Sequence, residues 1–297
     1  MLSLSPKNDL VFKALFGRHP NLLENALNGF LEHTGVTPIS DILILNPEIR
    51  PADVHEKFIV LDIRAKDAHG RTFNVEMQVR QHLEYGKRTL YYWSKLYSSQ
   101  LQRGEDYDQL RPTFGIHLLD FSPFADSTEP HYRFRLSDCR FPERRWCDDL
   151  EIHLLDLTQL QSRLPQLREE EWMYFLNRAM HEEESKMLEH IKNPAIHEAY
   201  AALKELSADA ELRELALQRE LQIHNEVTAL KRAKEEGLAQ GIQKGREEGI
   251  QKGIQKGREE GKQDGMRNML TNLLERGRIT QAEYDEELAK LPTDLQA

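Results

Sequence analysis

Residues 57–80 constrain the possible folds of this 297-residue chain more than any other segment. Apolar and polar side chains alternate with a period of two on both sides of Ala68-His69-Gly70, a pattern typical of half-buried strands. Those three residues suit a hairpin loop, because Gly70 can adopt a left-handed conformation. The segment therefore predicts an antiparallel β-hairpin.

The predicted register of this hairpin brings two acidic residues together. If the loop is those three residues, Asp67 faces Arg71, and counting back places Asp62 opposite Glu76. Strand parity puts Gln78 on the same face as Glu76. Like charges directly opposite each other destabilise a sheet, so the pair needs compensation. Mg²⁺, which takes one or two carboxylates, is one candidate. The other candidate is solvation, or neutralisation by three neighbouring basic residues, Arg64, Lys66 and Arg80. The spacing leaves both explanations open.

The residue types resemble a known signature. Asp62 followed by Glu76-Met77-Gln78 is similar to the D…E-x-K motif of the PD-(D/E)XK nucleases, with Gln in place of the usual Lys. A series of five blocks within residues 1–125 resembles the Rpn family of recombination-promoting nucleases, also described as transposases. In chain order the blocks are SPKNDLVFKALFG, LDIRAKD, NVEMQVR, KRTLYYWSKLYSSQL and PTFGIHLLDF.

This resemblance implies a fold and an activity. The fold would be α/β, with a PD-(D/E)XK nuclease-like core whose mixed central sheet is flanked by helices. The activity would be metal-dependent DNA endonuclease chemistry serving recombination or defence. Asp62 and Glu76 would hold Mg²⁺ or another divalent cation, and Gln78 would orient the attacking water. DNA is the implied partner, with these candidate contact residues: Asp9, Lys13, Arg80, Arg88, Tyr92 and Lys95.

Ordinary structural explanations for these contact residues stay open. Asp9 and Lys13 are spaced as a surface ion pair on a helix. The basic and aromatic stripe of residues 84–102 suits nucleic-acid backbone contact, but it also suits a solvated helix face with Tyr92 half buried.

Hydrophobic periodicity predicts helix, three strands, helix and strand, which is the order of the PD-(D/E)XK core. Ser5 and Pro6 are expected to start the first helix, as N-cap and first helical residue. The apolar strand 42–49 is expected at the centre of the sheet. The helix at 84–102 is expected to direct five residues to the core: Leu90, Trp93, Leu96, Tyr97 and Leu101. The remaining predicted elements are a helix after Pro20 that ends at Gly35, strands at 113–121, 132–136 and 150–155, and helical structure over 169–206.

Composition limits the possible binding partners and the cellular compartment of the protein. The net charge of −10 provides no global attraction for nucleic acid, so a nuclease would need a local basic surface. Two cysteines supply neither a disulfide framework nor a zinc motif. The sequence shows no leader pattern and no 18-residue apolar run, so we expect a cytoplasmic protein without a membrane segment.

The C-terminal region carries glycine at every fourth residue from Gly237 to Gly265. On a helix these glycines drift by about 40° per step, and each costs about 1 kcal/mol relative to alanine. The segment can be a solvated linker, a close-packed helix pair between protomers, or an arm that contacts nucleic acid. Residues 269–291 form an amphipathic unit too small for its own core, so it is expected to dock on this chain or on a partner copy. For the full chain we expect a homodimer or higher oligomer.

Four parts are predicted: a nuclease-like domain (1–160), a helical extension (161–230), a glycine-repeat helix or linker (231–266) and a small helical unit (267–297). The competing functional hypothesis is a catalytically weak or inactive nuclease-like module for DNA binding or assembly. It is favoured by Gln78 and by the acidic composition.

Overall fold

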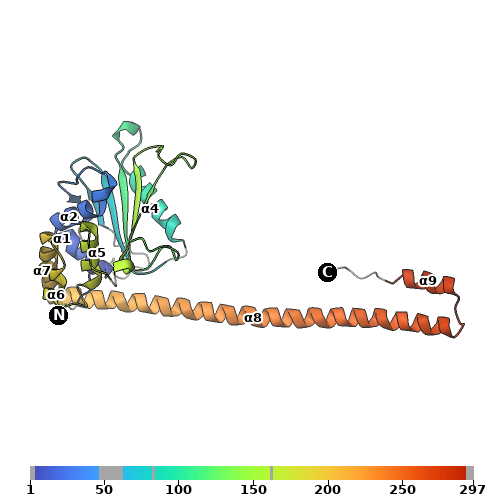
Figure 1. Ribbon diagram of the computed structural model, residues 1–297. Helices are drawn as coiled ribbons and strands as arrows, with labels where there is room; N and C mark the ends of the chain where they lie inside the picture. Colours follow the sequence, from blue (N-terminus) through green and yellow to red (C-terminus); the bar gives the residue numbers. More distant parts are fainter. Residues whose placement is uncertain (1–3, 47–62, 82–83, 161–162, 292–297) are drawn as a thin grey trace. The chain divides into compact units, whose positions relative to one another are not determined.

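The structure, a computed structural model, describes residues 4–46, 63–81, 84–160 and 163–291 (Figure 1). These residues fall into two compact units, residues 1–223 and 224–297. Each unit is described separately below.

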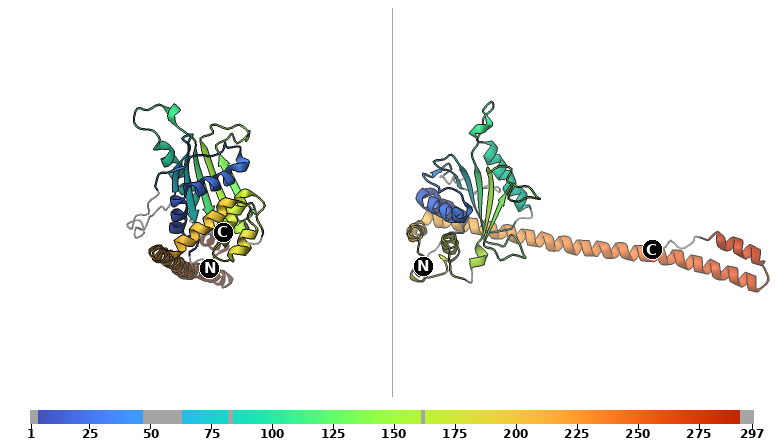
Figure 2. Two further views of the ribbon diagram at one scale, coloured as in Figure 1. Left: turned by 90° about the vertical axis from the view of Figure 1, so that its left-hand side faces the viewer. Right: turned by 45° about the horizontal axis from the view of Figure 1, so that its top comes forward.

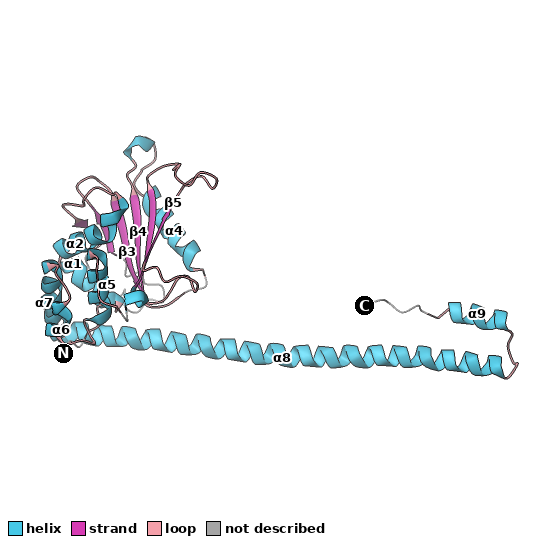
Figure 3. Cartoon of the chain, viewed as in Figure 1, coloured by secondary structure: helices cyan, strands magenta, loops and turns pink. Residues whose placement is uncertain are grey.

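A mixed sheet forms the centre of the first unit (Figure 3). Among the described residues it has six strands, in the order β1-β2-β3-β4-β6-β5. Strands β3, β4 and β6 run parallel to one another, and the other pairings are antiparallel. The strand bounds are β1 Leu43–Ile44, β2 Ile63–Lys66, β3 Thr72–Gln78, β4 Thr113–Leu119, β5 His131–Arg135 and β6 Leu150–Asp156.

The β2–β3 hairpin confirms the predicted register over the described residues. Ile63 pairs with Val75 and Lys66 pairs with Thr72. Gly70 has a φ angle of 79°, the left-handed conformation that the loop requires. Asp67 holds the turn, because its Oδ1 accepts from the backbone N–H of Arg71 at 2.9 Å and its Oδ2 accepts from the Arg71 Nε–H at 2.6 Å.

Helices cover both faces of the sheet (Figures 1 and 2). On one face, alternate residues of the strands, such as Phe73 and Phe114, join the main hydrophobic core. The helices around that core are α1 Asp9–Arg18, α2 Pro20–Leu31, α5 Arg168–Arg178, α6 Glu184–Glu189 and α7 Pro194–Ala208. Helix α4 (Tyr85–Ser98) covers the other face, where Tyr85, Leu119 and Leu154 form a small separate cluster. Short 3-10 turns lie at η1 Glu32–Thr34, η2 Tyr107–Gln109 and η3 Leu157–Leu160.

Two predictions about the N-terminal half are wrong. Helix α1 begins at Asp9 rather than at Ser5-Pro6, because the Asn8 side chain caps it by accepting from the backbone N–H groups of Leu10 and Val11. The strand expected at the sheet centre is β1, which is the edge strand among the described residues, and Leu43 is 63% exposed. An edge strand has a neighbour on one side only, so its apolar composition does not ensure burial. Residues 47–49 of that prediction lie outside the described part of the chain.

The predicted inward stripe of α4 is also wrong in part. Leu90 is 51% exposed, and the buried residues of the helix are Tyr85 and Thr89. The sheet face beneath α4 carries polar side chains, so hydroxyl-bearing residues face it rather than leucines. The helical region predicted at 169–206 is divided into α5, α6 and α7.

The second unit consists of the distal part of helix α8 (Ala210–Glu275) and helix α9 (Gln281–Ala289). The glycines from Gly237 to Gly265 are all helical, and a Cβ atom added to any of them would meet no atom within 4 Å. Gly277, with φ at 64°, lies in the turn before α9. None of the helices in the described part of the chain combines the length and hydropathy that crossing a membrane requires.

Candidate active site

Glu76 lies on β3, on the sheet face that α4 covers, and is only 3% exposed. Its own strand supplies hydrogen bonds to both carboxylate oxygens. Asn74 Nδ2 donates to Oε1 at 3.1 Å, and Gln78 Nε2 donates to Oε2 at 3.2 Å. The period of two along β3 places these three side chains on one face, as the sequence predicted.

The neighbouring strand and helix bring two basic side chains to the same carboxylate. His117 is the register partner of Glu76 on β4, and its Nδ1 lies 3.6 Å from Glu76 Oε2. Arg88 from α4 places Nη2 at 3.8 Å from the same oxygen. Tyr85, in the first turn of α4, shares a hydrogen bond of 3.0 Å with His117 Nδ1. Sequence periodicity did not indicate Tyr85 or His117, because their contacts join segments far apart in the chain.

These contacts set the charge state of Glu76. Burial acts to raise the pKa of its carboxyl group, but His117, Arg88 and Asn74 together outweigh burial and hold the pKa below its ordinary value of 4.5. Glu76 is therefore ionised at neutral pH. Burial, followed by the negative charge of Glu76, raises the pKa of Tyr85 above its ordinary value, so the phenol stays protonated.

The donor atoms around Glu76 fit a hard divalent cation. Asn74 Oδ1 is buried and has no hydrogen-bond partner among the described residues, so an oxygen beside the carboxylate is available. Carboxylate and amide oxygens are the ligands that Mg²⁺ and Ca²⁺ accept. Within the described ranges no group of three or more His, Cys, Asp or Glu residues has metal-binding geometry. Asp62, the predicted partner of Glu76, lies outside the described residues.

The other predicted residues have different environments. Arg88 lies near two aromatic rings, 5.9 Å from the centroid of Tyr85 and 6.0 Å from that of Tyr92. Tyr92 and Arg80 are half-buried, and Lys95 is exposed. Helix α4 therefore brings Arg88 to Glu76, while Lys95 faces solvent.

Asp9 and Lys13 are both engaged in the structure of α1. Asp9 forms an ion pair with Arg219 of α8, with Oδ2 at 2.7 Å from Nη2. Lys13 is buried on the same helix. Helix α1 joins the core on the sheet face opposite α4.

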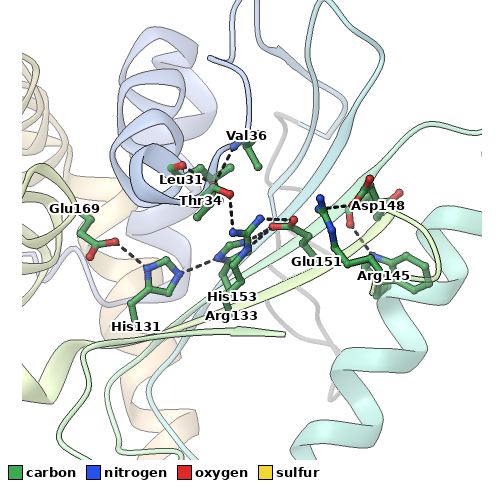
Figure 4. Close-up of polar contacts among 12 residues, drawn as sticks. Leu31, Thr34, Val36, His131, Arg133, Arg145, Asp148, Glu151, His153 and Glu169 are labelled. Atoms are coloured by element: carbon green, nitrogen blue, oxygen red, sulfur yellow. Dashed lines mark hydrogen bonds and ion pairs between the residues drawn. The ribbon is translucent and has the colours of Figure 1, made fainter. Parts of the chain in front are cut away.

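A second buried polar cluster lies on that opposite face (Figure 4). Its hydrogen bonds run from Glu169 Oε2 to His131 Nδ1 at 2.8 Å, and from His131 Nε2 to His153 Nδ1 at 2.8 Å. The chain continues from His153 Nε2 to Glu151 Oε2 at 3.1 Å. Arg133 donates to both oxygens of Glu151, at 2.9 and 2.5 Å. We name these five residues the Glu151 cluster.

The Glu151 cluster was missed because its histidines do not match a local metal motif. The available signal was the period of two, since His131 and Arg133 share one face of β5 while Glu151 and His153 share one face of β6. Burial lowers the pKa of His153 to about 4. Burial alone would raise the pKa of Glu151, but His153 and Arg133 bring it below its ordinary value.

The mixed sheet, its flanking helices and the hairpin that carries Glu76 define an α/β protein of the PD-(D/E)XK nuclease-like class. A family model described as PD-(D/E)XK nuclease family transposase matches residues 6–233. The chain belongs to this family, and the match confirms the resemblance to the Rpn nucleases. Searches of the curated proteins and of the solved structures gave no significant match.

Proposed function

We propose that this protein is a metal-dependent DNA endonuclease that hydrolyses phosphodiester bonds in recombination or defence. The observation that carries the proposal is Glu76, a buried and ionised carboxylate on the family hairpin, next to an amide oxygen without a hydrogen-bond partner among the described residues. Membership of a nuclease family supports the reaction class.

Asp62 and Glu76 are the proposed ligands of Mg²⁺ or another divalent cation. Ile63 pairs with Val75, and these two acidic residues are the next in sequence beyond that pair. When bound, the cation stabilises charge on the scissile phosphate and makes the attacking water more acidic. Gln78, at the end of β3, orients that water. Its amide can hold a hydrogen bond but cannot accept a proton as a base would.

Contacts to the DNA backbone are proposed for the basic and aromatic side chains near Glu76: Arg80, Arg88, Tyr92 and Lys95. They would provide the local positive surface that the net charge of −10 requires. Asp9 and Lys13 remain weaker candidates, because the ion pair with Arg219 gives Asp9 a structural role. We place the activity in the cytoplasm, where the free, exposed Cys139 and Cys147 stay reduced.

The test is incubation of plasmid DNA with the protein in Mg²⁺ and in EDTA. Asp62→Ala and Glu76→Ala should each lower the cleavage rate by more than about a hundredfold, because each removes a charged ligand. Glu84→Gln is the matched control, since the Glu84 side chain is 69% exposed and pairs with Lys87. Full cleavage by either Ala variant, or by the wild type in EDTA, would contradict the assignment.

The second candidate function is a nuclease-like module that binds DNA or assembles without cutting. Gln78 in place of the usual Lys is the observation that favours it. In that case the protein would bind DNA with no Mg²⁺-dependent cleavage. Loss of divalent-cation binding in Asp62→Ala would favour the enzyme instead.

Self-association through the second unit is also part of this proposal. The glycine positions of α8 leave the helix surface open, and apolar side chains beside them are exposed: Leu238, Ile242, Ile250 and Ile254. A second copy of the helix could approach closely at the glycines and cover these apolar groups, giving a homodimer or a larger assembly.

A further inference from the structure

The two oxygens of Glu76 have unequal surroundings. Oε1 accepts a hydrogen bond from Asn74, whose own Oδ1 has no hydrogen-bond partner among the described residues. Nitrogen groups from three different elements surround Oε2: Gln78 at 3.2 Å, His117 at 3.6 Å and Arg88 at 3.8 Å. Oε1 therefore has one neighbouring nitrogen, on a residue that also carries an oxygen without a described partner, whereas three nitrogen groups crowd Oε2.

The His117 ring is held in place from two sides. Tyr85 shares a hydrogen bond of 3.0 Å with Nδ1, and its ring meets the His117 ring edge-on at 5.8 Å. On the other side, Nε2 lies 3.0 Å from the position that a Cβ atom of residue 115 would occupy. Glycine at position 115 therefore leaves the space into which the ring fits.

Tyr85 is itself fixed by its neighbours. It is 9% exposed, belongs to the apolar cluster with Leu119 and Leu154, and meets Phe121 edge-on at 5.9 Å. Because Tyr85 lies in the first turn of α4, the position of that helix determines where the His117 ring lies. The ring in turn limits where Glu76 Oε2 can move.

We infer that His117, held by Tyr85, is a positioning residue that keeps the Oε1 edge of Glu76 turned towards the divalent cation. The inference rests on the proposed function and adds residues that do not themselves touch the cation. Groups that orient a metal-binding carboxylate typically change metal affinity or activity by 10- to 100-fold when they are removed.

The test measures Mg²⁺ binding by calorimetry and the Mg²⁺ concentration for half-maximal cleavage, both on the full chain. His117→Leu should raise both values by about tenfold. Tyr85→Phe, which removes one neutral hydrogen bond, should raise them by about threefold. His117→Asn should recover much of the loss, because its amide lies near the position of Nδ1. The KM for DNA should stay unchanged in all three variants.

Tyr132→Phe is the matched control for Tyr85→Phe. The Tyr132 hydroxyl is buried, has no hydrogen-bond partner among the described residues, and belongs to a side chain that packs on the same apolar cluster. Removing it should leave Mg²⁺ binding unchanged. Gly115→Ala gives an independent test, because the added methyl group displaces the His117 ring without removing any polar group. It should weaken Mg²⁺ binding in the same direction as His117→Leu.

Three results would overturn the inference. If the wild type binds Mg²⁺ and cleaves DNA while His117→Leu, Tyr85→Phe and Gly115→Ala bind Mg²⁺ equally well, His117 does not position Glu76. If His117→Asn is as defective as His117→Leu and both lose the same thermal stability, the role of His117 is structural. If the wild type neither binds Mg²⁺ nor cleaves DNA, the proposed function fails and the inference fails with it.

Discussion

The described strands carry a buried glutamate on each face of the sheet, Glu76 and Glu151, and the two differ in how closely basic side chains approach them. Glu76 and Glu151 are both 3% exposed. Arg133 donates to both oxygens of Glu151, and His153 contacts it at 3.1 Å. The basic groups near Glu76 lie farther away, at 3.6 and 3.8 Å. Arg133 thus pairs with both oxygens of Glu151, whereas the basic groups near Glu76 lie beyond hydrogen-bond distance and its hydrogen bonds come from the amides of Asn74 and Gln78.

This comparison teaches that burial of a carboxylate does not by itself mark an active site. A buried charge with ideal partners fastens elements together, and here Glu169 and Arg133 connect the β5–β6 edge with α5 and with the backbone oxygen of Thr34. A buried charge with distant partners and a neighbouring oxygen without a partner among the described residues is a better candidate for binding.

The largest expected effect is a contrast in stability between Glu151→Gln and Glu76→Gln. Glu151→Gln should lower the free energy of unfolding by about 3 kcal/mol, because it leaves Arg133 and His153 without their anion. Glu76→Gln should lower it by less than about 1 kcal/mol, since Arg88 is partly exposed and can be solvated. Urea unfolding at pH 7 measures both. Equal losses would mean that both glutamates serve the fold alike.

The pH dependence of stability sharpens the same contrast. The folded pKa of His153 is about 4, below its ordinary value of 6.5, so between these values the unfolded chain binds a proton that the folded chain does not. Stability is therefore fully present above pH 6.5 and falls as the pH drops towards 4. Between pH 7 and pH 5 this group should account for about 2 kcal/mol. The measurement is urea unfolding at the two pH values.

The variant His153→Gln should have a weaker pH dependence than the wild type over this range. His181→Asn, at an exposed position, is the control and should keep the wild-type dependence. An identical pH dependence in His153→Gln and the wild type would show that the lowered pKa of His153 does not cause the loss of stability at low pH.

On the sheet face that carries Glu76, the variant Gln78→Ala should have a smaller effect, which concerns the cleavage rate. Cleavage should fall by about tenfold, because one neutral hydrogen bond to the attacking water is lost. Mg²⁺ affinity should be nearly unchanged, since an amide is a weak ligand beside two carboxylates. Steady-state cleavage and Mg²⁺ calorimetry distinguish the two. A loss of affinity as large as that of Asp62→Ala would make Gln78 a primary ligand.

The smallest effect on chemistry is expected from removal of residues 231–297. The truncated chain should shift towards monomer in light scattering, while cleavage per chain changes by less than about twofold. All the residues of both buried clusters belong to the first unit and are kept in the truncated chain. The comparison is made at equal micromolar concentrations. A monomeric full-length chain would leave the helix as a linker.

The sequence by itself determined the features that repeat locally. Alternation along 63–79 set the hairpin and its register, and therefore placed Glu76 and Gln78 on one face. The sequence left residues 231–266 as a helix or a linker, and the structure has this segment within the helix α8. The hairpin predictions succeeded because the strand period relates neighbouring residues to a common face, whatever the rest of the chain does.

Only the tertiary structure decided which partners meet on those faces. The contact between Glu76 and His117 joins strands separated by more than thirty residues. Tyr85 reaches His117 because the first turn of α4 lies against the sheet. The Glu151 cluster likewise needs β5, β6 and α5 at once. The order of the described strands puts the apolar strand β1 at an edge, and Asp9, expected as a surface residue, forms an ion pair with Arg219. Such pairings depend on packing between distant segments, and a local period carries no information about them.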